Sequence, residues 1–197
     1  MKKVFLIGLL CLSALVGYTQ EEEDWQAGSP KYYRWLDGQT CKEVCGVRFG
    51  VPYETAKDML KKKFGEPSYL FTDENSIVYQ YKSYGGISFS SICFYFQRDG
   101  LNSYMNQCVM TIDCKTANDA KNKRDYIWSI AKGKYTAWNE GTDKNGFKYY
   151  ESGISPKGGG INTGFIVDVV KYDKAFDGCY YCARIMYGPY NYVKEEF

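Results

Sequence analysis

The sequence of 197 residues contains no histidine. Histidine is the side chain whose ordinary pKa lies closest to neutral pH, and it is the commonest metal-binding side chain. Its absence excludes Ser-His-Asp and Cys-His mechanisms, zinc sites with histidine ligands and facial-triad iron sites. We therefore expect no catalytic residue, no metal site and no cofactor, although a hydrolase that uses two carboxylates stays open as an alternative.

The sequence also lacks a surplus of charge of one sign. It contains 25 lysine and arginine residues and 23 aspartate and glutamate residues, which gives a formal net charge of +2. A basic surplus is the electrostatic signature of nucleic-acid binding. We therefore expect no nucleic-acid partner.

Long apolar runs are scarce as well, and the longest one lies at the N-terminus. Residues 4–16 carry no charge and follow two lysines, which is the pattern of a secretory signal peptide over residues 1–19. The run is too short to cross a membrane comfortably. A lipid anchor at Cys11 is not expected because Leu10, the residue before it, is large. We expect an exported protein, periplasmic or secreted, with no transmembrane segment in the mature chain.

Two segments of the mature chain have the periodicity of amphipathic helices, at residues 52–65 and 117–132. Thr116 and Asp119 have capping-box spacing at the start of the second segment, although aspartate replaces glutamate. The alternation of apolar and polar residues predicts three strands after each helix. These strands are expected at residues 77–82, 87–97, 104–113, 147–152, 165–172 and 179–187.

This order predicts an α+β fold of two tandem helix-plus-antiparallel-sheet units, α-β-β-β repeated, with the helices packed on one face of the sheet. The expected parts are a flexible or irregular segment at 20–49, a first unit at 50–114 and a second unit at 115–197, packed with the first. An internal duplication is indicated by Gly85-Gly86-Ile87 and Gly159-Gly160-Ile161. At the same offset, Cys108 falls on Cys182.

A helix that ends in F-G-x-P, followed by a polar loop and a strand with alternating aromatics, occurs here as "AKDMLKKKFGEPS" and "SIVYQY". This pattern resembles the small envelope proteins of the SmpA/OmlA class. A tandem pair of such units is similar to the arrangement in β-lactamase inhibitor proteins. The start and end of the signal peptide look like those of secreted Bacteroidetes proteins of unknown function. The resemblance implies strands with helices on one face, and another face open to a protein partner.

Seven cysteines remain after the signal peptide: Cys41, Cys45, Cys93, Cys108, Cys114, Cys179 and Cys182. The turn signal at residues 98–102 predicts a hairpin in which Cys93 and Cys108 face each other, so this pair is the disulfide candidate. Cys41 and Cys45 are open to an internal bridge, a bond to Cys114 or Cys179, or a zinc site with Cys179 and Cys182. Residues that favour strands surround Cys179 and Cys182. A redox C-x-x-C motif instead places its first cysteine at the start of a helix, so a redox function is not expected here.

Tyrosine is abundant, with 20 residues, and is the most positive indication of function. One interpretation is that half of the tyrosines fill the core and the rest cover the sheet with their hydroxyls in water. The other is a tyrosine-rich sheet face that binds a protein, because such side chains give large, rigid contacts. We expect a protein–protein interaction of an envelope assembly factor or inhibitor-like kind, and a carbohydrate-binding module is the alternative. The candidate binding residues are Tyr79, Tyr81, Tyr149, Tyr150, Tyr180 and Tyr181.

Overall fold

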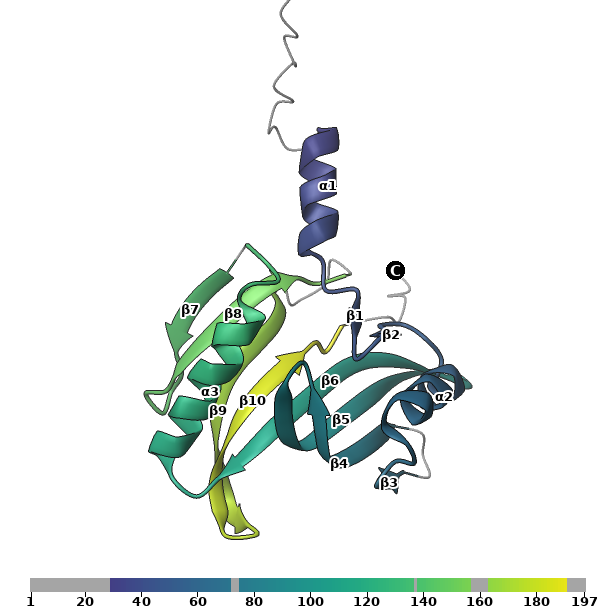
Figure 1. Ribbon diagram of the computed structural model, residues 1–197. Coiled ribbons are helices and arrows are strands. Elements are labelled where there is room, and N and C mark those ends of the chain that lie inside the picture. Colours follow the sequence, from purple (N-terminus) through teal and green to yellow (C-terminus); the bar gives the residue numbers. More distant parts are fainter. Residues whose placement is uncertain (1–28, 72–74, 137, 157–162, 191–197) are drawn as a thin grey trace, which may run out of the picture. The chain divides into compact units, whose positions relative to one another are not determined.

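The computed structural model describes residues 29–71, 75–136, 138–156 and 163–190 (Figure 1). The expected signal peptide and Cys11 lie outside these residues. The chain divides into two units, Met1–Trp35 and Leu36–Phe197, and the boundary falls inside helix α1 (Pro30–Gln39). The account of the fold below concerns the second unit.

An eight-stranded sheet forms the centre of this unit, in the order β3-β4-β5-β6-β10-β9-β8-β7. Every neighbouring pair in it is antiparallel, which confirms the α+β class. The strands are β3 (Tyr69–Leu70), β4 (Ser76–Tyr84), β5 (Ile87–Asp99), β6 (Asn102–Cys114), β7 (Trp138–Thr142), β8 (Lys148–Ile154), β9 (Thr163–Phe176) and β10 (Cys179–Tyr187).

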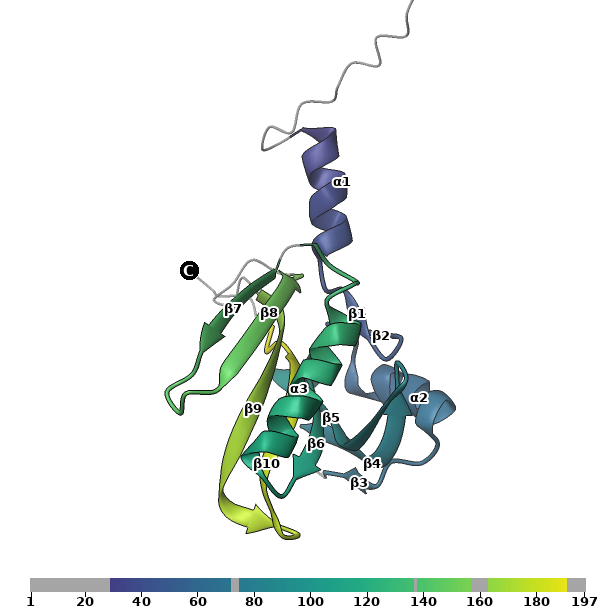
Figure 2. The ribbon, with the colours of Figure 1, turned by 60° about the vertical axis from the view of Figure 1, so that its left-hand side comes forward.

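Helices α2 (Tyr53–Phe64) and α3 (Ala117–Ala131) pack on the same face of the sheet (Figures 1 and 2). Leu60 of α2 and Ile127 of α3 are both fully buried and belong to one hydrophobic cluster. The predicted cap of α3 is confirmed, because the Thr116 hydroxyl accepts a hydrogen bond from the backbone N–H of Asp119 at 3.1 Å. The helix positions and the placement on one face agree with the sequence prediction.

Five elements were not predicted. The segment 20–49, expected to be irregular, contains α1 and a hairpin of β1 (Glu43–Val44) and β2 (Val47–Arg48). Strands β3 and β7 give each half of the sheet four strands instead of three. Strand β3 has only two residues, too few to show alternation, and the centre of β7 is Asn139-Glu140-Gly141, residue types that are depleted in strands.

The two expected units share one sheet, because β6 of the first half pairs directly with β10 of the second. Residues 36–197 accordingly form one compact unit, with no boundary near residue 114. The predicted glycine match of the duplication includes Gly159 and Gly160, which lie outside the described residues, so the duplication stays a prediction.

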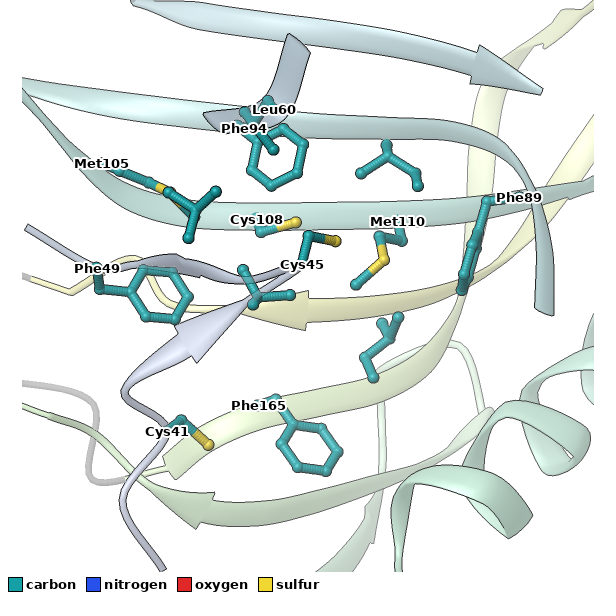
Figure 3. Close-up of a cluster of buried hydrophobic side chains, with 14 of the residues drawn as sticks. Cys41, Cys45, Phe49, Leu60, Phe89, Phe94, Met105, Cys108, Met110 and Phe165 are labelled. Atoms are coloured by element: carbon teal, nitrogen blue, oxygen red, sulfur yellow. The ribbon is translucent and has the colours of Figure 1, made fainter. Parts of the chain in front are cut away.

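The main core lies between the sheet and the elements that cover its helix side. Phe94, Met105 and Met110 of the sheet belong to one cluster with Leu60 of α2, and Figure 3 shows Phe94 beside Leu60. Two cysteines of the segment before α2, Cys41 and Cys45, also lie in this cluster, as does Cys108 of β6. Buried reduced cysteines behave there as small apolar side chains.

Candidate functional site

The face of the sheet opposite α2 and α3, here called the open face, is the candidate site. Side chains alternate between the faces of a strand, and Ile92, Met110 and Ile185 point into the core on the helix side. The residues that alternate with these three along each strand therefore point to the open face. Cross-strand pairing places five half-buried apolar residues of this face in one row, called the apolar row: Val78, Cys93, Val109, Met186 and Ile166.

A second row on the open face is polar and runs beside the first. It consists of Gln80, Ser91, Thr111, Arg184 and Asp168. The Ser91 and Thr111 hydroxyls share a hydrogen bond of 2.8 Å. The Arg184 guanidinium donates to both carboxylate oxygens of Asp168, at 3.0 and 2.6 Å. The two charges of this row therefore neutralise each other, and such bidentate pairs have a fixed geometry.

A tyrosine hydroxyl and two thiols on the open face, those of Tyr172, Cys93 and Cys182, stay protonated at neutral pH. The Tyr172 hydroxyl donates a hydrogen bond of 2.9 Å to Asp113. Burial raises the pKa of Tyr172, and its contacts with Cys182 and Asp113 raise it further. Burial also raises the pKa of the Cys93 and Cys182 thiols. A protonated thiol is a poor nucleophile, so this arrangement is suited to contact rather than to nucleophilic chemistry.

The structure does not bring the six predicted tyrosines together. Tyr79 is fully buried on the helix side, and Tyr150 stacks on Trp128 of α3 with ring centroids 4.8 Å apart. Tyr181 packs against Phe147, on the helix side as well. The remaining three are the exposed Tyr81 and Tyr180 and the half-buried Tyr149. The six tyrosines therefore do not share one face. Alternation separates Tyr149 from Tyr150 and Tyr180 from Tyr181, and the positive φ of Tyr81, where the pairing of β4 with β5 is interrupted, separates Tyr81 from Tyr79.

Two other tyrosines lie at the rim of the open face. Tyr69 of β3 is opposite Val78 and is 55% exposed, and Tyr95 of β5 is 38% exposed. Tyr95 could have been found from the sequence, because it alternates with the buried Phe94 and Phe96. Tyr69 carries no such signal, since its strand has only two residues.

The predicted disulfide between Cys93 and Cys108 is not formed, and all seven cysteines of the described residues are free. The hairpin is present, but a bulge between Tyr95 and Phe96 shifts its register by one residue. Cys93 is then opposite Val109, and Cys108 points into the core. A shift of one residue moves a side chain to the other face of the strand.

Cys179 and Cys182 lie in β10, as predicted, with a register shift between Cys179 and Tyr181. Within the part of the chain that the structure describes, no group of three or more cysteine, aspartate or glutamate side chains is placed to hold a metal ion. The zinc hypothesis for these cysteines and Cys41 and Cys45 therefore receives no support from the geometry.

Comparisons with protein-family models, with curated proteins and with solved structures find no significant match. The resemblance to SmpA/OmlA proteins and to β-lactamase inhibitor proteins therefore stays a prediction. None of the helices in the described ranges has the length and apolarity needed to cross a membrane.

Proposed function

We propose that this is an exported, non-enzymatic protein that binds another protein through the open face. The observation that carries the proposal is the apolar row, which crosses five strands on a face that neither α2 nor α3 covers. Contiguous apolar surface beside polar groups is typical of protein-binding sites. The role would be that of an envelope assembly factor or an inhibitor, as the sequence resemblance implies.

A protein fits this face better than a glycan does. Sugar rings stack on flat aromatic side chains. Tyr69 and Tyr95, two exposed tyrosines at the rim of the face, lie on strands separated by β4 at different registers. The rest of the face presents aliphatic side chains and a thiol in the apolar row, and hydroxyl groups and a neutralised ion pair in the polar row. Such a mixed surface matches the apolar centre and polar margin of a protein interface.

The dimensions of the face predict a weak, transient complex. Five strands about 4.8 Å apart extend over about 19 Å, and the residues that flank both rows make the face roughly 20 Å along the strands. The resulting area of roughly 400 Å² is about half of what each partner buries in a standard interface. We therefore expect a dissociation constant in the micromolar range. Such a complex dissociates during the wash steps of a pull-down, so covalent cross-linking is the better assay.

The test places a photoreactive amino acid at Thr111, in the centre of the open face, and illuminates the protein with envelope and secreted fractions of its host. We expect a cross-linked protein that disappears when Val109→Arg is introduced, because a charged side chain then stands in the apolar row. The matched control is Leu101→Arg. Leu101 is fully exposed in the β5–β6 turn, so this change adds the same charge away from the face.

Two results would contradict the proposal. One is a cross-linked protein that resists Val109→Arg or is lost equally with Leu101→Arg. The other is no cross-linked protein at all together with binding on a glycan array, which would favour the carbohydrate-binding alternative. Circular dichroism of each variant establishes that the sheet is intact before binding is compared.

A further inference from the structure

Two cysteines far apart in the sequence meet in the core. Cys45 lies between β1 and β2, and Cys108 lies in the middle of β6. Their exposed fractions are 1% and 0%, and both belong to the same hydrophobic cluster. Burial raises the pKa of the Cys108 thiol, and the neighbouring Cys45 raises it further. In Figure 3 the sulfur of Cys108 points toward Cys45.

The backbone at Cys45 holds its side chain in this position. Cys45 and Gly46 have φ values of +55° and +77°, as the two central residues of a type I′ turn require. Asparagine, aspartate or glycine normally occupies the first of these positions, because other residues are strained there. Among the described residues, three non-glycine residues have positive φ, namely Cys45, Tyr81 and Asp177, and Cys45 alone of them is buried.

The other cysteines considered as partners of Cys45 lie elsewhere. The Cys41 sulfur lies against Gly153 and Gly164, where an added Cβ would stand 2.6 and 2.3 Å from it. Figure 3 accordingly shows Cys41 beside Phe165 and away from Cys45. Cys114 belongs to the second hydrophobic cluster, and Cys179 lies opposite Phe176 at the β9–β10 turn. Cys93 and Cys182 are on the open face, across the sheet from Cys45. Cys108 is thus the cysteine within reach of Cys45.

We propose that Cys45 and Cys108 form a disulfide when the chain folds in the presence of a disulfide oxidant, such as a thiol oxidase or oxidised glutathione. This bond would fasten the β1–β2 hairpin to the centre of the sheet. The proposal does not depend on the proposed function, since both sulfurs lie on the helix side.

The reaction is thiol–disulfide exchange. The thiolate of one cysteine attacks a sulfur of the oxidant disulfide, forms a mixed disulfide and releases one oxidant thiolate. The thiolate of the second cysteine then attacks the cysteine sulfur of the mixed disulfide and releases the other oxidant thiolate. The two cysteine protons pass through solvent to the released thiolates, and the oxidant gains two electrons. Because both sulfurs are buried in the folded protein, the exchange precedes final packing of the core.

The test refolds the reduced full-length chain in a glutathione redox buffer. The product is denatured, treated with iodoacetamide without reductant and digested with trypsin. We expect peptide 43–48 joined to peptide 99–115, two mass units lighter than the sum of the free peptides. Fragment ions distinguish Cys108 from Cys114, which lies in the same peptide.

Variants identify the pair. Cys45→Ser should leave Cys108 open to alkylation, whereas Cys93→Ser, which alters a cysteine on the open face, should leave the joined peptides unchanged. The proposal is overturned if the refolded wild-type protein, with native circular dichroism, has both cysteines alkylated or has Cys45 bound to another cysteine. This measurement on the wild type decides the matter even if a variant fails to fold.

Discussion

Tyr79→Phe should stabilise the protein, although it alters the core. Tyr79 is fully buried, and its hydroxyl has no hydrogen-bond partner among the described residues. Its ring packs against Phe64 and Phe94, with centroids 5.2 and 6.4 Å away. The substitution removes the hydroxyl and leaves these ring contacts in place.

The expected magnitude follows from the desolvation of the hydroxyl. A buried polar group without a partner costs about 1–3 kcal/mol. Removing one oxygen atom leaves a small void, which offsets part of this gain. We therefore expect the free energy of unfolding to rise by about 1 kcal/mol at pH 7, which corresponds to about 2–4 °C in Tm for a domain of this size.

The effect should increase at alkaline pH. Burial raises the pKa of Tyr79 to about 12, from 10 for an exposed tyrosine. Between pH 10 and 12 the unfolded chain has lost this proton while the folded chain keeps it, so stability falls as pH rises. A shift of this size corresponds to about 3 kcal/mol at most. Phenylalanine has no such proton, so the advantage of the variant should widen from pH 9 to pH 12.

Urea denaturation of both proteins at several pH values measures this difference. Tyr190→Phe is the matched control, because Tyr190 is equally buried but its hydroxyl donates a hydrogen bond to the Gly164 carbonyl. That variant should lose about 1–2 kcal/mol, since it leaves a buried carbonyl unpaired. The reasoning is refuted if Tyr79→Phe destabilises the protein as Tyr190→Phe does, or if its effect does not change with pH.

Three further substitutions test other parts of the structure. Thr116→Ala removes the cap of α3 and should cost about 1 kcal/mol in urea denaturation. Gly164→Ala would place its Cβ 2.3 Å from the Cys41 sulfur and should cost about 2–3 kcal/mol, of which Cys41→Ala restores a part. Arg184→Met leaves the mostly buried Asp168 carboxylate unpaired and should lower stability by about 2 kcal/mol, whereas a double variant that adds Asp168→Leu should recover most of it.

Local patterns were sufficient to predict both helices of the sheet unit and six of its strands. The apolar spacing that includes Ala56 and Leu60 places one face of α2 on the core, and both residues are fully buried. The glycine-containing turn between β5 and β6 predicts their hairpin. These features depend on residues close together in the sequence, so a single sequence contains the information needed.

Features that depend on non-local pairing were not predictable in this way. No residue type in the sequence marks the bulge after Tyr95. The bulge nevertheless shifts the pairing by one residue, so that Cys93 and Cys108 no longer face each other. Tyr79 and Tyr81 both look like strand residues, but one is fully buried and the other is 79% exposed. The sequence pattern also contains nothing that selects β10 as the neighbour of β6.

The pairing of β6 with β10 creates the candidate site and also separates it from the proposed disulfide. Val109 of β6 lies opposite Met186 of β10, so the apolar row is continuous only because these two strands are neighbours. Cys108, the residue before Val109, points to the other side of the sheet. Adjacent substitutions can therefore separate the two proposals. Cys108→Ser should lower stability under oxidising conditions and leave cross-linking at Thr111 intact, whereas Val109→Arg should abolish cross-linking and leave the disulfide in place.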